Sequence, residues 1–431
     1  MAKINNVILE YKTVISQTGI PADTKPPKAV IRRFVKVFSS VQDRRLDSMI
    51  DYPLAEILLI TFLAVLANAS TWTEIAQFGE EKQRWLRKFL RMKNGIPSHD
   101  TFRRVFSLID SDTLQKATVQ FLVENMNALR RSVGLDNEGG YRLICVDGKE
   151  ERGTGRKYGT NEAVRNLQTL HVYDATHSIC LCSQPIDTKT NEIPVAQEIL
   201  KILDLKRCIV TFDALHTQKE TISIVANQKG DYVGGLKGNQ SGMLEAVRSV
   251  FTDSKKEQVK KKGRYFYETS EKSHNQIEIR RFYRIAATCG QKEWEKLKSF
   301  VCYEKHTCNI ITGIEKTECR FYLSSLQEVE LIAQAIRGHW AVENNLHWHL
   351  DYSFSEDTLT TMDKQAFQNL SLINKLVLSL CKAAQPLMKN SIRTIRLRFS
   401  WNLEDNLAVL LNAFDSVSIK KCLESTALAK K

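Results

Sequence analysis

Two short apolar runs that each end in an aspartate constrain the fold of this chain more than any other feature. Tyr141–Val146 is almost entirely apolar and precedes Asp147, and Cys208–Phe212 precedes Asp213. Short apolar runs of this kind predict strands that are buried on both faces. Polar residues at the ends of neighbouring strands in an open α/β sheet lie beyond the same edge. We therefore expect Asp147 and Asp213 to converge if their strands are neighbours.

The order of elements around these runs predicts the fold class. After Gly139 and Gly140 the pattern gives strand, strand, strand, helix, strand, helix, strand. Besides the two runs above, the expected strands are Leu167–Asp174, Ile179–Gln184 and Tyr232–Leu236, with a helix over Pro194–Leu203. Alternation of this kind favours an α/β fold with a mixed sheet flanked by helices.

A third carboxylate is expected from the segment 337–351, which has helical periodicity. His339, Glu343, His347 and Asp351 recur every four residues and so form one polar stripe. Glu343, in the middle of that stripe, can face the two aspartates. An exposed stripe is an alternative, but the neighbouring tryptophans make full exposure unfavourable. Zinc bound by the histidines is another, although the H-E-x-x-H spacing is absent.

Three carboxylates that converge favour a hard divalent cation. They repel one another unless a cation neutralises them, and oxygen ligands suit Mg²⁺, with Mn²⁺ as a substitute. Two such ions can activate a water or a 3′-hydroxyl and stabilise a leaving oxygen. Each aspartate taken alone could instead be a turn or cap residue. The combination with Glu343 favours a metal site made of Asp147, Asp213 and Glu343.

The first third of the chain predicts helices and a DNA contact. Residues 1–36 are interpreted as a basic arm, and the periodicity from about residue 37 to 130 is helical. Ser98 or Asp100 can cap a short helix that carries Arg103 and Arg104. Two helices, a turn and this helix are compatible with a helix-turn-helix that binds DNA. The alternative is that the two arginines belong to a solvated helix face.

The stretch 245–323 is interpreted as a β-rich insertion. Its period-two runs predict a small antiparallel sheet over 265–269, 276–285, 299–303 and 309–314. A basic run precedes the first strand, which begins with three aromatic residues. Cations beside aromatic rings can hold a DNA backbone and stack on unpaired bases. The residues predicted to do so are Lys260, Lys261, Lys262 and Arg264, with a solvated loop as the alternative.

The net charge and the positions of the cysteines limit the class of binding partner and the cellular compartment that we expect. The chain has 62 Lys and Arg against 49 Asp and Glu, a net charge of +13, which suits a polyanion such as nucleic acid. The longest apolar stretch, 57–69, is shorter than the roughly 20 residues that span a bilayer, and Met1–Thr13 lacks a signal-peptide core. No two of the ten cysteines form a C-x-x-C pair. They are interpreted as buried thiols in a reducing cytoplasm, neither a zinc framework nor a disulfide scaffold.

Several sequence blocks resemble the DDE transposases of bacterial insertion sequences of the ISAs type, the H-repeat-associated proteins. The resemblance extends from about residue 40 to 410, including a helical block that is similar to the family's N-terminal associated domain. Two positions depart from the wider group, which has Arg in place of His339 and often an Arg-rich stretch in place of 358–361. The blocks are VDGKE (146–150), TNEIP (190–194), VTFDALHTQ (210–218), LKGNQ (236–240), YLSSL (322–326), HWAVEN (339–344), LHW (346–348) and FSED (354–357).

The resemblance implies an RNase H-like mixed sheet core with the β-rich insertion, preceded by an all-helical domain. It implies a Mg²⁺-dependent enzyme that cuts and joins double-stranded DNA at the terminal inverted repeats of its element, as a possible homodimer, in the bacterial cytoplasm or nucleoid. The family's catalytic residues fall on Asp147, Asp213 and Glu343. The basic residues and histidines that we expect near DNA phosphates or behind the metal ligands are Lys149, Lys237, His339 and His347.

The expected organisation follows from the periodicity and the resemblance together. The alternative functions are an RNase H-fold nuclease that cleaves without joining, and a host-adopted DNA-binding protein that no longer catalyses. The expected parts are a basic arm (1–36), a helical DNA-binding domain (37–130), the first part of the core (138–244), the β-rich insertion (245–323), the second part of the core with the Glu343 helix (324–395) and a helical tail (396–431).

Overall fold

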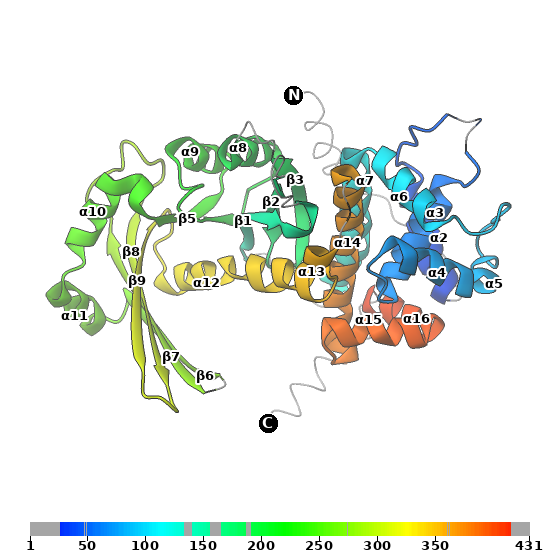
Figure 1. The fold of residues 1–431 in the computed structure, drawn as a ribbon. Helices are drawn as coiled ribbons and strands as arrows, with labels where there is room; N and C mark the ends of the chain where they lie inside the picture. The colour runs from blue at the N-terminus through cyan, green and yellow to red at the C-terminus, as the bar shows by residue number, and fades with distance from the viewer. Residues whose placement is uncertain are drawn as a thin grey trace, which may run out of the picture.

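Across the described residues, nine strands form one mixed sheet in the order β3-β2-β1-β4-β5-β9-β8-β7-β6 (Figure 1). The computed structural model describes residues 26–46, 48, 50–132, 140–155, 165–186, 191–273, 275–359, 361 and 363–414. The strands are β1 (Arg142–Glu151), β2 (Leu167–Asp174), β3 (Ile179–Ile186), β4 (Cys208–Phe212), β5 (Asp231–Leu236), β6 (Phe266–Ser273), β7 (Gln276–Ala286), β8 (Ser299–Asn309) and β9 (Glu315–Ser324).

The half of the sheet formed by β1 to β5 is RNase H-like. Strands β1, β2 and β3 form an antiparallel meander, and β4 and β5 lie parallel to β1. The parallel strand β4 is buried along its whole length, as the continuous apolar run predicted. The mixed sheet and the order of its first elements are therefore confirmed.

The other strands, β6 to β9, are called the β-wing here. All of its pairings are antiparallel, and β9 pairs with β5, so the wing continues the core sheet instead of forming a separate small one. One prediction is wrong in detail, because residues 310–314 form the turn between β8 and β9 and the fourth strand of the wing follows that turn. Most of the basic run belongs to the helix α11 (Asp253–Lys261), and its last residues follow the end of that helix. Thr252 caps this helix by accepting a hydrogen bond from the backbone N–H of Lys255.

Helices cover both faces of the sheet (Figure 1). One hydrophobic cluster joins the inner strands to α8 (Glu192–Ile202), α9 (Lys219–Asn227), α10 (Ser241–Val250) and α11. A second cluster joins the other face to α12 (Val329–His339). The chain then passes through a π-helical segment η6 (Val342–His347) to α13 (Trp348–Tyr352) and a 3₁₀ turn η7 (Glu356–Thr358).

The remaining helices form a helical lobe that combines both ends of the chain. Helix α14 contacts α3, α6 and α7, and α16 contacts α2, within one hydrophobic core. The N-terminal helices alone therefore lack part of their own core. The lobe consists of α2 (Pro26–Phe38), α3 (Leu54–Leu66), α4 (Trp72–Glu81), α5 (Gln83–Leu86), α6 (His99–Leu108), α7 (Ser111–Ser132), α14 (Lys364–Met388), α15 (Ile392–Trp401) and α16 (Leu403–Phe414).

The prediction of a basic arm over residues 1–36 is partly wrong, because helix α2 begins at Pro26. Its apolar side chains at helical spacing pack into the lobe, with Phe34 stacked on Phe62 at a ring distance of 4.6 Å. Basic residues on the other side of the helix gave the segment the composition of an arm. The rest of the predicted arm (1–25) and residues 415–431 of the predicted tail lie outside the described residues. No described helix has both the length and the apolar composition needed to cross a membrane.

Candidate active site

Strand pairing places Asp147 beside Asp213. Val146 on β1 pairs with Phe212 on the parallel strand β4, so the next residue of each chain segment is an aspartate. This confirms that the two strands are neighbours. Asp147 is not at a strand end, however, because β1 continues to Glu151 in antiparallel pairing with β2. Asp147 marks the position where pairing with β4 stops and one side of β1 becomes free.

The segment expected to carry the third carboxylate is helical, but not uniformly α-helical. Glu343 lies in the π-helical segment η6, which inserts one extra residue per turn between α12 and α13. The polar stripe still faces the sheet. His339 Nδ1 is 2.9 Å from Thr211 Oγ1 on β4, and His347 Nε2 is 2.9 Å from His171 Nδ1 on β2. Glu343 is exposed and lies between these two anchoring contacts.

The two histidines of the stripe are neutral. Burial lowers the pKa of His339 to about 4 and that of His347 to about 3. His347 Nδ1 is 3.8 Å from an oxygen of Asp147, yet it supplies no positive charge to that carboxylate at neutral pH. Neither histidine is therefore a cationic phosphate contact in this structure.

The surroundings of Asp147 disfavour the ionised form of its carboxyl group. Burial, then the carboxylates of Glu343 and Asp213, raise the pKa of Asp147 to about 7. The ligand atoms of these three carboxylates do not all lie within 4.8 Å of one another. Among the described residues, only one group of three side chains of metal-ligating type meets that limit, and it lies on the β-wing. Like charges that share a site without a counterion repel one another. Three oxygen ligands with uncompensated charge fit a hard divalent cation.

Lys149 occupies the interior and not a DNA-facing surface. Its side chain is 5% exposed, forms a short ion pair with Glu151, and lies 2.9 Å from Asp351 of α13 and 3.9 Å from Glu356 of η7. Burial opposes the charge of Lys149, but the carboxylates of Glu356 and Glu151 outweigh it and raise the pKa of the lysine. A contact of Lys149 with a DNA phosphate does not fit this burial, whereas a position behind the metal ligands stays a prediction. This ion cluster instead fastens β1 to the segment that follows Glu343.

The other predicted DNA contacts lie on the surface. Lys237 is exposed after β5, and Arg104 is exposed on α6. Arg103 is half-exposed and lies 3.5 Å from Asp100, while Ser98 is the residue that caps α6. Of the four exposed cations at the end of α11, two lie beside aromatic rings: the Lys260 ammonium is 5.7 Å from the Phe266 ring and the Arg264 guanidinium is 5.7 Å from the Tyr265 ring. The exposed cations there are Lys260, Lys261, Lys262 and Arg264.

A carboxylate and a histidine beside Asp147 were not predicted as site residues. His216 is 1% exposed, and its Nε2 is 3.2 Å from an oxygen of Glu192. The same Glu192 carboxylate packs against Gly148, where a Cβ atom would lie 2.6 Å from its oxygens. A larger residue at position 148 would therefore displace the carboxylate of Glu192 from β1. Both residues fall within the blocks that carried the resemblance, 190–194 and 210–218, which was the available signal.

Comparisons with known proteins identify the family. The model described as "Transposase DDE domain" matches residues 138–380, and the model described as "DDE_Tnp_1-associated" matches residues 35–122. The chain belongs to the DDE transposase family. The first match covers the strands that carry Asp147 and Asp213 and the segment that carries Glu343.

Relatives of this transposase span most of its length. The "Putative transposase YncI" of Escherichia coli O157:H7 is 30% identical over 381 residues, which are 86% of this chain and 93% of the relative. The "H repeat-associated putative transposase YhhI" of Escherichia coli K12 is 30% identical over 339 residues, 76% of this chain and 84% of the relative. Family membership makes this chain a DNA-cleaving and strand-transferring enzyme of the insertion-sequence type that depends on divalent metal ions.

Proposed function

We propose that Asp147, Asp213 and Glu343 hold the catalytic metal ions of this transposase, with Mg²⁺ as the native ion and Mn²⁺ as a substitute. The observation that carries the proposal is the raised pKa of Asp147, which burial and the two other carboxylates produce together. Divalent cations at such a site activate a water or a 3′-hydroxyl and stabilise the leaving oxygen of the cut strand.

The surrounding structure holds the three carboxylates in position. Asp147 lies in β1 and Asp213 follows β4 directly, so the pairing of these two strands places the two aspartates beside each other. Glu343 is exposed on the π-helical segment, and the anchoring of His339 to Thr211 and of His347 to His171 fixes the backbone on either side of it. Neutral His347 leaves the charge of Asp147 available for a cation.

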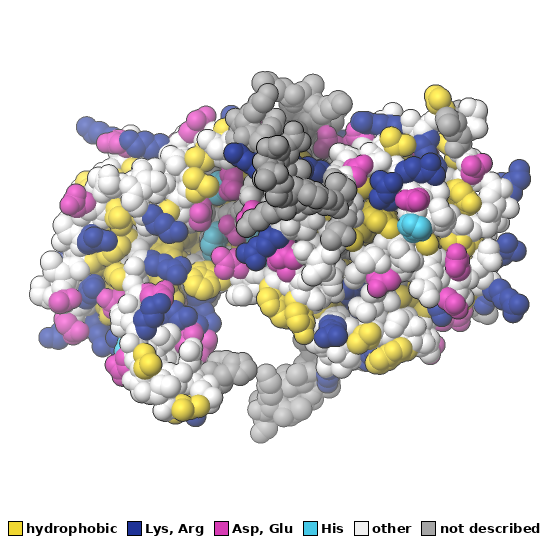
Figure 2. All heavy atoms as spheres, viewed as in Figure 1, with side chains coloured by type: hydrophobic (Ala, Val, Ile, Leu, Met, Phe, Trp, Pro, Cys, Tyr) yellow, Lys and Arg dark blue, Asp and Glu magenta, His cyan; other side chains and the backbone are white. Residues whose placement is uncertain are grey.

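We infer that the partner is double-stranded DNA at the element's own terminal inverted repeats, bound by a homodimer in the bacterial cytoplasm or nucleoid. A cavity of about 140 Å³ next to the catalytic segment supports a DNA contact there. Trp340 and Arg337 of the α12 segment and Lys305 of β8 line it, and Arg320 lies 4.9 Å from the Trp340 ring. Figure 2 shows the molecule hollowed between the β-wing and the helical lobe, with Lys and Arg side chains gathered on the wing.

The direct test is to incubate the purified full chain with DNA that carries the element's ends, with and without Mg²⁺. Both cleaved and joined products are scored. We expect both products with Mg²⁺ or Mn²⁺ and neither without a divalent ion. Cleavage without joining would overturn strand transfer and favour a nuclease, and equal cleavage of DNA that lacks the repeats would overturn the proposed partner.

Metal binding at the three carboxylates is expected to weaken about tenfold for each pH unit below about 7. Asp147 must lose its proton to bind a cation, and its pKa of about 7 means that it is mostly protonated at pH 6. Titration calorimetry with Mn²⁺ in buffers of different ionisation enthalpy measures the proton release directly. About one proton per chain should be released at pH 6 and almost none at pH 8.5. Affinity that stays constant from pH 5.5 to 8.5 would contradict a role for Asp147 as a ligand.

Replacing Arg103 and Arg104 together by alanine should weaken binding to the element's end in the full chain. The full chain is needed because α14 to α16 complete the core of the helical lobe. Each phosphate contact that is lost should reduce the slope of log affinity against log salt by about one, whereas a lost base contact should relax sequence preference. Fluorescence anisotropy over a salt series measures both effects. Unchanged affinity and slope would make α6 a packing helix and not a DNA reader.

Neutralising the four cations at the end of α11 should lower cleavage of duplex ends about tenfold or more while the melting temperature changes little. These side chains are exposed, so their loss removes charge without opening the core. Cleavage rate and melting temperature are measured on the same samples at two salt concentrations, and added salt should shrink the difference between variant and native protein. If the variant cleaves at the native rate at both salt concentrations, the end of α11 does not contact DNA. It would then be a cover for the sheet edge or a dimer contact.

A further inference from the structure

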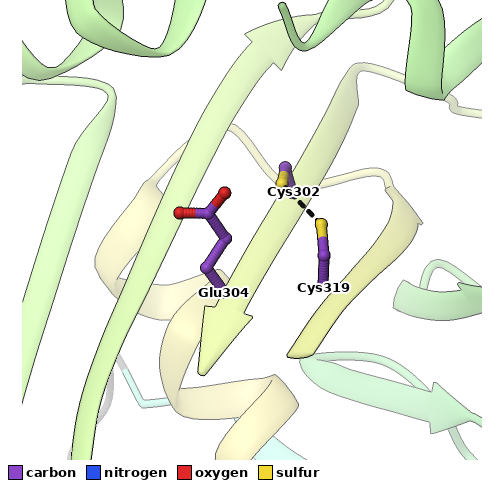
Figure 3. Close-up of side chains that lie close together, drawn as sticks. All are labelled: Cys302, Glu304 and Cys319. Carbon is purple, nitrogen blue, oxygen red and sulfur yellow. Dashed lines mark hydrogen bonds between the residues drawn. The ribbon is translucent and has the colours of Figure 1, made fainter. Parts of the chain in front are cut away.

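A cluster of sulfur and carboxylate side chains lies on two strands of the β-wing (Figure 3). Cys302 and Glu304 of β8 and Cys319 of β9 have ligand atoms that all lie within 4.8 Å of one another, the only such group of three among the described residues. The two sulfurs are 3.4 Å apart. Strand register brings the group together, because Glu304 pairs directly with Cys319 and Cys302 lies two residues earlier on the same face of β8.

One side of the cluster is buried and the other faces solvent. Cys302 is buried in the cluster that joins the sheet to α10 and α11, whereas Cys319 is exposed. Lys256 of α11 donates a hydrogen bond of 2.7 Å to one oxygen of Glu304. The Tyr283 hydroxyl is also a hydrogen-bond partner of this carboxylate, and a solvent-facing position remains beside Cys319 for another group. The prediction that the cysteines are buried thiols is wrong for Cys319 and for Cys289, which are both exposed.

The strand positions of the two cysteines favour a bridging ion over a disulfide. They are diagonal neighbours in the antiparallel ladder, since Cys302 pairs with Phe321 and not with Cys319. Diagonal neighbours have Cα atoms about 7–8 Å apart, which is beyond the usual reach of a disulfide. An ion that binds both sulfurs at about 2.3 Å with tetrahedral geometry needs sulfurs about 3.8 Å apart, close to the observed separation.

We propose that Cys302, Cys319 and Glu304 bind a thiophilic divalent cation of the Zn²⁺ type, with a solvent molecule as the fourth ligand. Two thiolates, the Glu304 carboxylate, the Lys256 ammonium and a divalent cation have no net charge together, so the partly buried site is electrically balanced. Metal binding releases the two thiol protons to solvent, and no oxidant or reductant takes part. The bound ion joins β8 to β9 beneath α11, the helix whose end carries Lys260 and Lys261. This site is independent of the catalytic carboxylates.

Cobalt(II) titration of the full chain, stripped of metal under reducing conditions, tests the proposal. Cobalt bound by thiolates gives an intense charge-transfer absorption in the near ultraviolet, which the carboxylates at the catalytic site cannot produce. We expect this band to saturate at about one equivalent per chain and to disappear when Zn²⁺ is added. Zn²⁺ should also raise the melting temperature by about 2–4 °C.

Two variants and one matched control complete the test. Cys319→Ser alters an exposed side chain, so it should fold normally, lose the band and lose the melting-temperature rise. Glu304→Gln should keep the band but weaken Zn²⁺ binding at least tenfold. Cys308→Ser, on the same strand but outside the cluster, should behave as the native protein. Absence of the band in the native chain, a band that survives in Cys319→Ser, or a Cys302–Cys319 disulfide found by mass spectrometry of the air-exposed protein would each overturn the proposal.

Discussion

Asp147→Asn, Asp213→Asn and Glu343→Gln are each expected to lower Mg²⁺-dependent cleavage of the element's ends by on the order of 10³-fold or more. Each change replaces a charged oxygen ligand by a neutral amide of the same shape, so the strands and the π-helical segment keep their packing. DNA affinity should change less than about threefold, because binding rests on phosphate contacts elsewhere. Single-turnover cleavage and anisotropy on the same protein samples measure the two effects.

The matched control is Glu198→Gln, which neutralises an exposed carboxylate on α8 and should leave cleavage unchanged. If Glu343→Gln cleaved at close to the native rate, the third ligand would have to be another carboxylate of the same segment. Asp351 and Glu356 are poor replacements because both lie beside the Lys149 ammonium. The structure therefore favours Glu343 over Asp351 and Glu356.

Asp147→Asn also has a stability effect that separates a metal ligand from a structural residue. The folded-state pKa of Asp147 lies above its ordinary value of 3.8, so its carboxyl group destabilises the metal-free fold increasingly as the pH rises through about 7. The neutral amide avoids that cost. Without metal at pH 8, the variant should be more stable than the native chain by about 2–4 kcal/mol, and the difference should vanish near pH 4. A variant that is less stable at pH 8 would contradict the repulsion among the three carboxylates.

Lys149→Met is expected to destabilise the protein by about 3–5 kcal/mol and to reduce cleavage with it. The substitution leaves Glu151 and Glu356, each 1% exposed, without the Lys149 ammonium. It also removes the contact with Asp351 that fastens the end of the catalytic segment to β1. Urea unfolding monitored by circular dichroism measures the loss. Cleavage should fall even under conditions where the variant remains folded, because Glu343 loses part of its anchoring.

A second variant distinguishes an uncompensated charge from a packing defect. The triple change Lys149→Met, Glu151→Gln, Glu356→Gln removes Lys149 and its two buried glutamates together, while the buried Lys375 ammonium near Glu151 remains, so part of the lost stability should be recovered. Lys201→Met replaces an exposed lysine on α8 and should change stability by less than about 0.5 kcal/mol. A loss below about 1 kcal/mol in Lys149→Met would mean that water, and not the lysine, compensates the two glutamates.

Local pattern was enough to predict the elements that position the candidate site. The apolar runs before Asp147 and Asp213 form β1 and β4, because a strand that is buried on both faces admits few polar side chains. The cap at Ser98 and the helical periodicity before Asp351 are equally local, since they depend on residues within one or two turns of each other. The resemblance of ordered blocks added the family, and the match over 138–380 bears it out.

Properties that depend on pairs distant in sequence were decided only by the tertiary structure. Strand β1 continues beyond Asp147 because it pairs with β2. Lys149 lies in the interior because the carboxylates of Glu151 and Glu356 stabilise its charge there, although a lysine by itself suggests an exposed cation. The register of β8 and β9 places Cys302 beside Cys319 across a hairpin. The sequence did not predict this contact, because the two cysteines are not in a C-x-x-C pair. A side chain's charge and reactivity follow from which groups surround it, and strand register and burial select those groups after the chain has folded.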